Sequence, residues 1–106
     1  MTEEFEALME NDVALTHIIK AAFDKYNADK SGEIDINDIN VFKDIIKNML
    51  KELKAPKVNS SQLKNFLDFD MIETEKPGKI NLKEFSQEIK FLFASYLGMI
   101  KRSKIK

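Results

Sequence analysis

Residues 27–38 read N-A-D-K-S-G-E-I-D-I-N-D, and this stretch decides the fold. Side-chain oxygens recur at its first, third and fifth positions, in Asn27, Asp29 and Ser31. Gly32 at the sixth position permits a sharp turn that a residue with a Cβ would resist. Oxygens at alternate positions of such a turn can surround a hard dication such as calcium, which takes about six to eight oxygen ligands. The stretch therefore predicts an ion-binding loop.

The second half of the loop completes the predicted ligand set. We expect Glu33 to offer its backbone carbonyl, Asp35 to act directly or through water, and Asp38 to close the loop from the following helix. Ile34 is apolar because it should pair in a short strand with Ile80 of a second loop. The predicted metal ligands are Asn27, Asp29, Ser31, Glu33, Asp35 and Asp38.

An internal repeat supports this interpretation. Residues 23–34 and 69–80 both begin with Phe-Asp and both end in Lys-x-Gly-x-Ile at the same offsets. Around these segments, apolar residues recur at the three- and four-residue spacing of amphipathic helices. Thr2 to Glu10 has the same spacing and predicts an extra N-terminal helix, and Gly98 is a natural stop for the last helix. The sequence therefore predicts an all-α fold.

These features together resemble the EF-hand family, over nearly the whole chain. The family's loop motif is D-x-[DN]-x-[DN]-G-x5-E. The resemblance implies paired EF-hands, two helix–loop–helix units joined by a short two-stranded pairing of their loops. It divides a single domain, residues 1–106, into EF-hand one (about 12–54), a linker (55–60), EF-hand two (about 61–97) and a basic tail (99–106).

Loop 27–38 departs from the motif at two positions. Asn27 stands where the family has Asp, which removes a negative charge and should weaken affinity. Asp38 stands where the family has Glu, and its shorter side chain reaches less well for bidentate ligation. We expect calcium as the ion. The shorter carboxylate favours six-coordinate geometry, which makes magnesium a competitor.

Loop 73–84, E-T-E-K-P-G-K-I-N-L-K-E, looks like a degenerate copy of the first. Pro77 offers no side-chain ligand at the fifth position, and the glutamates at positions one and three are longer than the usual Asp. We expect a structural half whose Ile80 completes the strand pairing. If this loop holds an ion, the candidate ligands are Glu73, Glu75, Lys79, Asn81 and Glu84.

Composition excludes several other classes of protein. The chain has no cysteine and one histidine, and we find no nucleophile–base arrangement or phosphate-binding glycine loop, so we do not expect an enzyme. A formal net charge of −1 gives no reason to expect a nucleic-acid partner. The N-terminus has no basic segment followed by an apolar run, so we expect a cytoplasmic protein, with association with the cytoskeleton as one option.

The leading functional hypothesis is an ion-responsive interaction module that couples ion binding in loop 27–38 to recognition of an amphipathic helix of a target protein. Met49, Met71 and Met99 are the candidates for the partner groove, because methionine surfaces adapt to varied helices. The alternative is a constitutive subunit, like a myosin light chain, that binds a target helix with little ion dependence. The basic tail could attach to an acidic partner or to anionic lipid, and the length also fits one part of a longer chain with further EF-hands.

Overall fold

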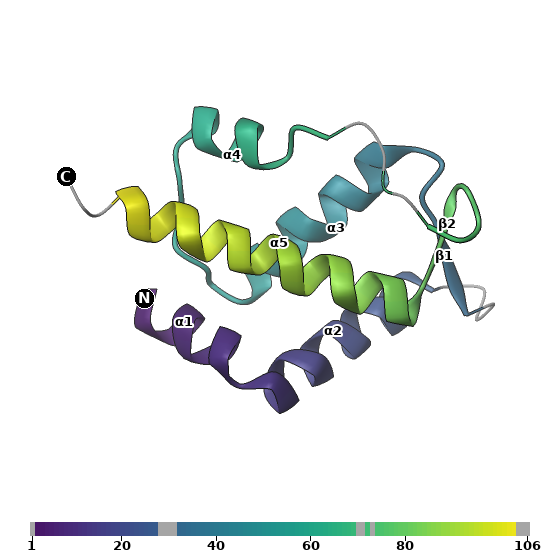
Figure 1. Cartoon of the computed structure of the whole chain (residues 1–106), viewed down its shortest axis with the longest axis horizontal. Coiled ribbons are helices and arrows are strands. Elements are labelled where there is room, and N and C mark those ends of the chain that lie inside the picture. Colours follow the sequence, from purple (N-terminus) through teal and green to yellow (C-terminus); the bar gives the residue numbers. More distant parts are fainter. Residues whose placement is uncertain (1, 28–31, 70–71, 73, 104–106) are drawn as a thin grey trace.

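Five helices and two short strands make up the described part of this computed structural model, which comprises residues 2–27, 32–69, 72 and 74–103. The prediction of a mainly helical fold with one small strand pairing is confirmed. In chain order the elements are α1 (Thr2–Glu10), α2 (Asp12–Tyr26), β1 (Glu33–Asp35), α3 (Ile39–Glu52), α4 (Ser60–Phe66), β2 (Lys79–Asn81) and α5 (Leu82–Ser103), as Figure 1 shows.

Asparagine side chains set where two of the helices begin. Asn11 Oδ1 accepts a hydrogen bond from the N–H of Ala14 (3.1 Å) at the start of α2. At the start of α4, Asn59 Oδ1 accepts from the N–H of Gln62 (2.8 Å), and Gln62 Oε1 accepts from the N–H of Asn59 (3.1 Å). This reciprocal pair is a capping box, which satisfies two backbone donors that the helix itself cannot.

The two strands join the loops that the repeat predicts. β1 and β2 are antiparallel, with Ile34 opposite Ile80. Both side chains are buried, at 4% and 0% exposure. The N–H of Ile36 extends the ladder by donating to the carbonyl of Gly78 (2.8 Å). The predicted pairing of Ile34 with Ile80 is confirmed.

Aromatic residues of α5 form the centre of the core. Phe85 is fully buried, and its ring centroid lies 5.5 Å from that of Phe23 on α2 and 6.2 Å from that of Phe42 on α3. Further along α5, Phe93 and Tyr96 contact Phe5 of α1, with centroids 6.0 and 5.9 Å apart. In Figure 1, α5 accordingly runs along the middle of the molecule between the other helices. No helix in the part of the chain that the structure describes is long and apolar enough to span a membrane.

The last helix does not stop at Gly98, so the prediction of a stop there is wrong. α5 continues to Ser103 and includes the first residues of the predicted basic tail. A glycine inside a helix costs about 1 kcal/mol relative to alanine. Burial of Ile100 offsets this cost, since its side chain is only 4% exposed in the continued helix. Lys101 also forms an ion pair with Glu6 of α1.

Candidate metal centre

The first loop follows α2 directly. The N–H of Asn27 donates to the carbonyl of Phe23 (2.9 Å), which is the last hydrogen bond of that helix. Gly32, at the sixth loop position, has a φ of +89°, in the left-handed region that favours glycine. β1 begins at the next residue. The predicted turn at Gly32 is therefore present.

Asn27 carries the most informative atom of this loop. Its Oδ1 is buried and accepts no hydrogen bond within the described part of the chain. A buried acceptor without a partner costs about 1–3 kcal/mol, and so it needs an explanation. A hard cation bound beside this oxygen would satisfy it, because amide oxygens are good calcium ligands.

The carboxylates of Asp35 and Asp38 are directed to the start of α3. Asp35 Oδ1 accepts from the N–H of Asn37 (2.9 Å), and its Oδ2 lies 3.7 Å from Nζ of Lys79 on β2. Asp38 Oδ1 accepts from the N–H of Asn40 (3.0 Å) and caps α3. Both carboxylates are exposed, and each has oxygen lone pairs left for a ligand.

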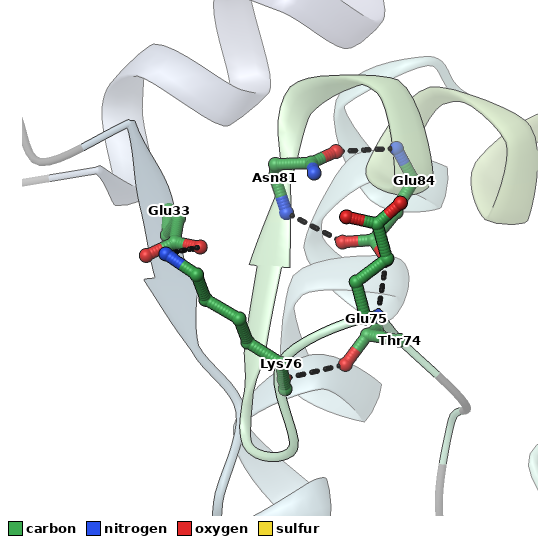
Figure 2. A network of polar contacts seen from close by, with 6 residues as sticks. All are labelled: Glu33, Thr74, Glu75, Lys76, Asn81 and Glu84. Carbon is green, nitrogen blue, oxygen red and sulfur yellow. Dashed lines mark hydrogen bonds and ion pairs between the residues drawn. The ribbon is translucent and has the colours of Figure 1, made fainter.

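Glu33 has separate roles for its side chain and its backbone. Its carboxylate pairs with Nζ of Lys76 in the second loop, at 3.3 Å (Figure 2). The ladder bond between Ile36 and Gly78 makes Ile34 and Ile80 a hydrogen-bonded pair, because such pairs alternate along antiparallel strands. The Glu33 carbonyl therefore faces away from β2, and its predicted role as a backbone ligand stays a prediction.

The structure describes only some of the predicted ligands. Asp29 and Ser31 lie outside the described residues, as does Glu73 of the second loop. Within the described ranges, no three Asp, Glu or His side chains converge on one point. The described residues of the first loop thus offer a buried amide oxygen, one backbone carbonyl and two carboxylates that also bind backbone N–H groups.

The second loop is closed by Glu84 (Figure 2). Glu84 Oε1 accepts from the N–H of Asn81 (3.1 Å), and Oε2 accepts from the N–H of Glu75 (2.8 Å). The N–H of Glu84 in turn donates to Asn81 Oδ1 (2.9 Å). Asn81 thus caps α5, and one carboxylate ties the beginning of the loop to its end. The hydroxyl of Thr74 adds a further bond to the carbonyl of Lys76 (2.7 Å).

The two loops also contact each other outside the strands. Gly78 has a φ of +80°, and a Cβ built on it would lie 2.0 Å from Oδ1 of Asn37. The Asn37 side chain therefore occupies the space that any other residue at position 78 would need. Sequence reasoning did not find this contact, nor the pairing of Lys76 with Glu33. In the sequence, only the opposite charges of Lys76 and Glu33 indicated that these two residues could pair.

Met49 and Met99, two of the methionines predicted to line a partner groove, lie in different surroundings. Met49 is a core residue on α3, 3% exposed. Met99 lines a depression of about 460 Å³ beside α4 and α5, together with Phe66 and Phe91. Met71 lies outside the described residues.

Comparisons with known protein families, with curated proteins and with solved structures gave no match. The chemistry of the site must therefore be judged from its own residues. Neutral and anionic oxygens at the first loop suit a hard cation. In the second loop, the Glu84 carboxylate is already bonded to backbone N–H groups at both ends of the loop.

Proposed function

We propose that the chain is a calcium-binding module of the EF-hand type, which couples ion binding in loop 27–38 to recognition of a partner protein. Two helix–loop–helix segments support this proposal, each with a left-handed glycine at the sixth loop position. The antiparallel pairing at Ile34 and Ile80 supports it as well. The observation that carries ion binding is the buried Asn27 Oδ1, which has no partner within the described residues.

The residues that would hold the ion are those whose oxygens border the first loop. Among the described ones these are Asn27 through Oδ1, Glu33 through its carbonyl, and the carboxylates of Asp35 and Asp38. Calcium, with magnesium as competitor, would supply a hard positive centre for these oxygens. Lys79 competes with the ion for Asp35, whereas Lys76 pairs with the Glu33 carboxylate, which is not one of these ligands.

The position of the loop suggests how ion binding would reach a partner. The loop connects α2 to α3, and Asp38 is at once a candidate ligand and the N-cap of α3. Any change in the orientation of Asp38 therefore acts on the first turn of a helix whose other end lies far from the loop. In this proposal α3 is the element that carries the response.

Thermal unfolding in chelator and in calcium tests the proposal through Asn27. At a hundredfold excess over Kd, an ion that binds only the folded state adds about 2.7 kcal/mol. This corresponds to a rise in Tm of about 10 °C, at about 4 °C per kcal/mol. Asn27→Ala should remove most of this rise. In chelator the same variant should be as stable as the wild type or more stable, because it removes a buried acceptor without a partner.

Asn40→Ala is the matched control, because Asn40 is exposed and its contact with Asp38 uses only the backbone N–H. This variant should keep the calcium-induced rise in Tm. Failure of calcium to raise the Tm of the wild type, up to about 5 mM, would refute ion binding at the affinities of about 10⁻³ M or tighter that EF-hands have.

A constitutive subunit is the second candidate function, and one set of contacts favours it. Glu84 closes the second loop with hydrogen bonds to backbone N–H groups, and two lysines of that loop pair with Glu33 and Asp35 of the first. These contacts need no ion. A partner that binds equally well in chelator and in calcium would favour this function over the ion-responsive one.

A further inference from the structure

A second surface, away from the ion loops, combines an apolar floor with a basic rim. It consists of two adjoining depressions of about 570 and 390 Å³. They share Lys47 and Leu63, so they form one groove along α3, the α3–α4 connection and α4. Leu50, Val58 and Leu63 contribute apolar side chains to the floor. We call this surface the lysine groove.

Six lysines line the lysine groove: Lys43, Lys47, Lys51, Lys54, Lys57 and Lys64. Three of them are spaced four residues apart on α3, which places them on one face of that helix. None of the six forms an ion pair with another described residue, whereas Lys25, Lys76, Lys79, Lys90 and Lys101 all do. Asp68 is the only acidic residue among the described ones that line the groove. In a chain with a net charge of −1, this is a strong local concentration of positive charge.

The shape of the surface distinguishes between possible occupants. A bilayer is flat, so it would meet the lysines but could not reach an apolar floor recessed between them. The acidic helix of a second copy, α1, is already committed, since Phe5 is 2% exposed within its own chain and Glu6 pairs with Lys101. An amphipathic helix with acidic residues beside its apolar stripe would match both the floor and the rim.

We propose that the lysine groove binds an acidic amphipathic helix of a partner protein. This inference names the partner class of the interaction module proposed above, and it rests on that proposal only in treating the chain as such a module. It does not depend on the ion. The acidic side chains of the partner pair with the lysines on the rim, and its apolar stripe covers Leu50, Val58 and Leu63.

Fluorescence anisotropy with a designed peptide tests this inference. The probe is a labelled helix of roughly 18 residues with leucine at the core-facing positions and glutamate elsewhere. A second peptide with glutamine in place of every glutamate measures the part of the affinity that does not need charge. Lys47→Glu with Lys51→Glu is the test variant. Lys20→Glu with Lys83→Glu, on α2 and α5, changes the net charge equally at exposed positions outside the groove.

The acidic peptide should bind the wild type and the control variant within about twofold of each other. The test variant should bind it at least about tenfold more weakly, since two attractions become repulsions. Folding should survive, because Lys47 and Lys51 are exposed and form no ion pair with a described residue that the substitutions would break. The two new carboxylates would lie four residues apart on α3, where a like-charge pair costs only a few tenths of a kcal/mol.

Three results would overturn the inference. Equal weakening by both variants would mean that only bulk charge matters. Equal affinity for the glutamate and glutamine peptides would mean that the rim contributes nothing. Binding to vesicles of phosphatidylcholine and phosphatidylserine, lost in the test variant while the peptide fails to bind, would assign the surface to a membrane. The calcium-induced rise in Tm, measured on the same samples, reports separately on the ion loop.

Discussion

Replacing Glu84 by Gln should destabilise the protein by the same amount with and without calcium. The carboxylate accepts two backbone hydrogen bonds, at 2.8 and 3.1 Å, from opposite ends of the second loop. Glutamine keeps one acceptor oxygen but turns an NH₂ group toward the other N–H donor. A hydrogen bond to a charged group contributes about 1.5–3 kcal/mol. Because Glu84 is half-buried, we take the lower figure, which predicts a fall in Tm of about 6 °C.

Differential scanning fluorimetry in chelator and in calcium measures this effect, with Glu75→Gln as the matched control. Glu75 lies in the same loop and bonds Glu84 only through its backbone N–H, so the control loses the same charge but not the contact. We expect it to stay within about 2 °C of the wild type. A fall in Tm that appears for Glu84→Gln only in calcium would refute the reasoning, because it would identify Glu84 as an ion ligand of the second loop.

The remaining predictions concern the two loop glycines, Asp38 and a buried tyrosine. Gly78→Ala should lower the free energy of unfolding by about 3 kcal/mol in urea denaturation, and Gly32→Ala by only about 1 kcal/mol. The reason is that a Cβ at 78 overlaps Asn37, whereas one at 32 meets no described atom within 4 Å. Equal losses would mean that the contact between Gly78 and Asn37 is unimportant. Asp38→Glu should tighten calcium binding severalfold in isothermal titration, since the longer carboxylate reaches for bidentate ligation, and unchanged affinity would exclude residue 38 as a ligand. Burial raises the pKa of the Tyr96 phenol above its ordinary value of 10.0. The contribution of the neutral phenol to the free energy of unfolding is therefore complete below pH 10 and is lost as the pH rises above 10. The free energy of unfolding should therefore fall less steeply above pH 10 for Tyr96→Phe than for the wild type, and parallel curves would contradict this.

The pairing of the two loops could be predicted because it depends on short-range pattern. A glycine two residues before an isoleucine occurs in both loops, and each part has a local reason, a left-handed turn and an apolar strand position. That the Asn27 side chain and the Glu33 carbonyl bind an ion stays a prediction. Local sequence is sufficient wherever backbone conformation and ladder alternation decide the geometry.

The start of α3 could not be predicted in the same way. Asp35 and Asp38 are both good N-cap residues, and they stand where Asn81 and Glu84 stand in the second loop. In the second loop the helix begins directly after Asn81, but in the first it begins only after Asp38. The bond from Ile36 to Gly78 keeps the first loop extended for longer, and this bond comes from a residue far away in the chain. Competing caps are therefore resolved by tertiary contacts.

The lysine groove was missed for a related reason. The four-residue spacing on α3 was visible in the sequence, but a row of lysines on a helix is ordinarily a solvated face. Its significance arises only when the α3–α4 connection and α4 bring Lys57, Lys64 and an apolar floor beside it. Conversely, the stop predicted at Gly98 failed because burial of Ile100 outweighs a local helix-breaking preference.

If the ion loop and the lysine groove act as one device, they must do so through α3. Asp38 caps this helix at the loop, and Lys47 and Lys51 lie on its groove face. Coupling between two binding sites is reciprocal, so calcium must tighten binding of the acidic peptide by the same factor by which the peptide tightens calcium binding. Typical couplings span about 5- to 150-fold, and we expect about fivefold because Asp38 is a short ligand. Both factors are measurable by titration, with the Lys47→Glu, Lys51→Glu variant as control for calcium binding directly to the peptide. A factor of one in both titrations would separate the two sites and favour the constitutive subunit.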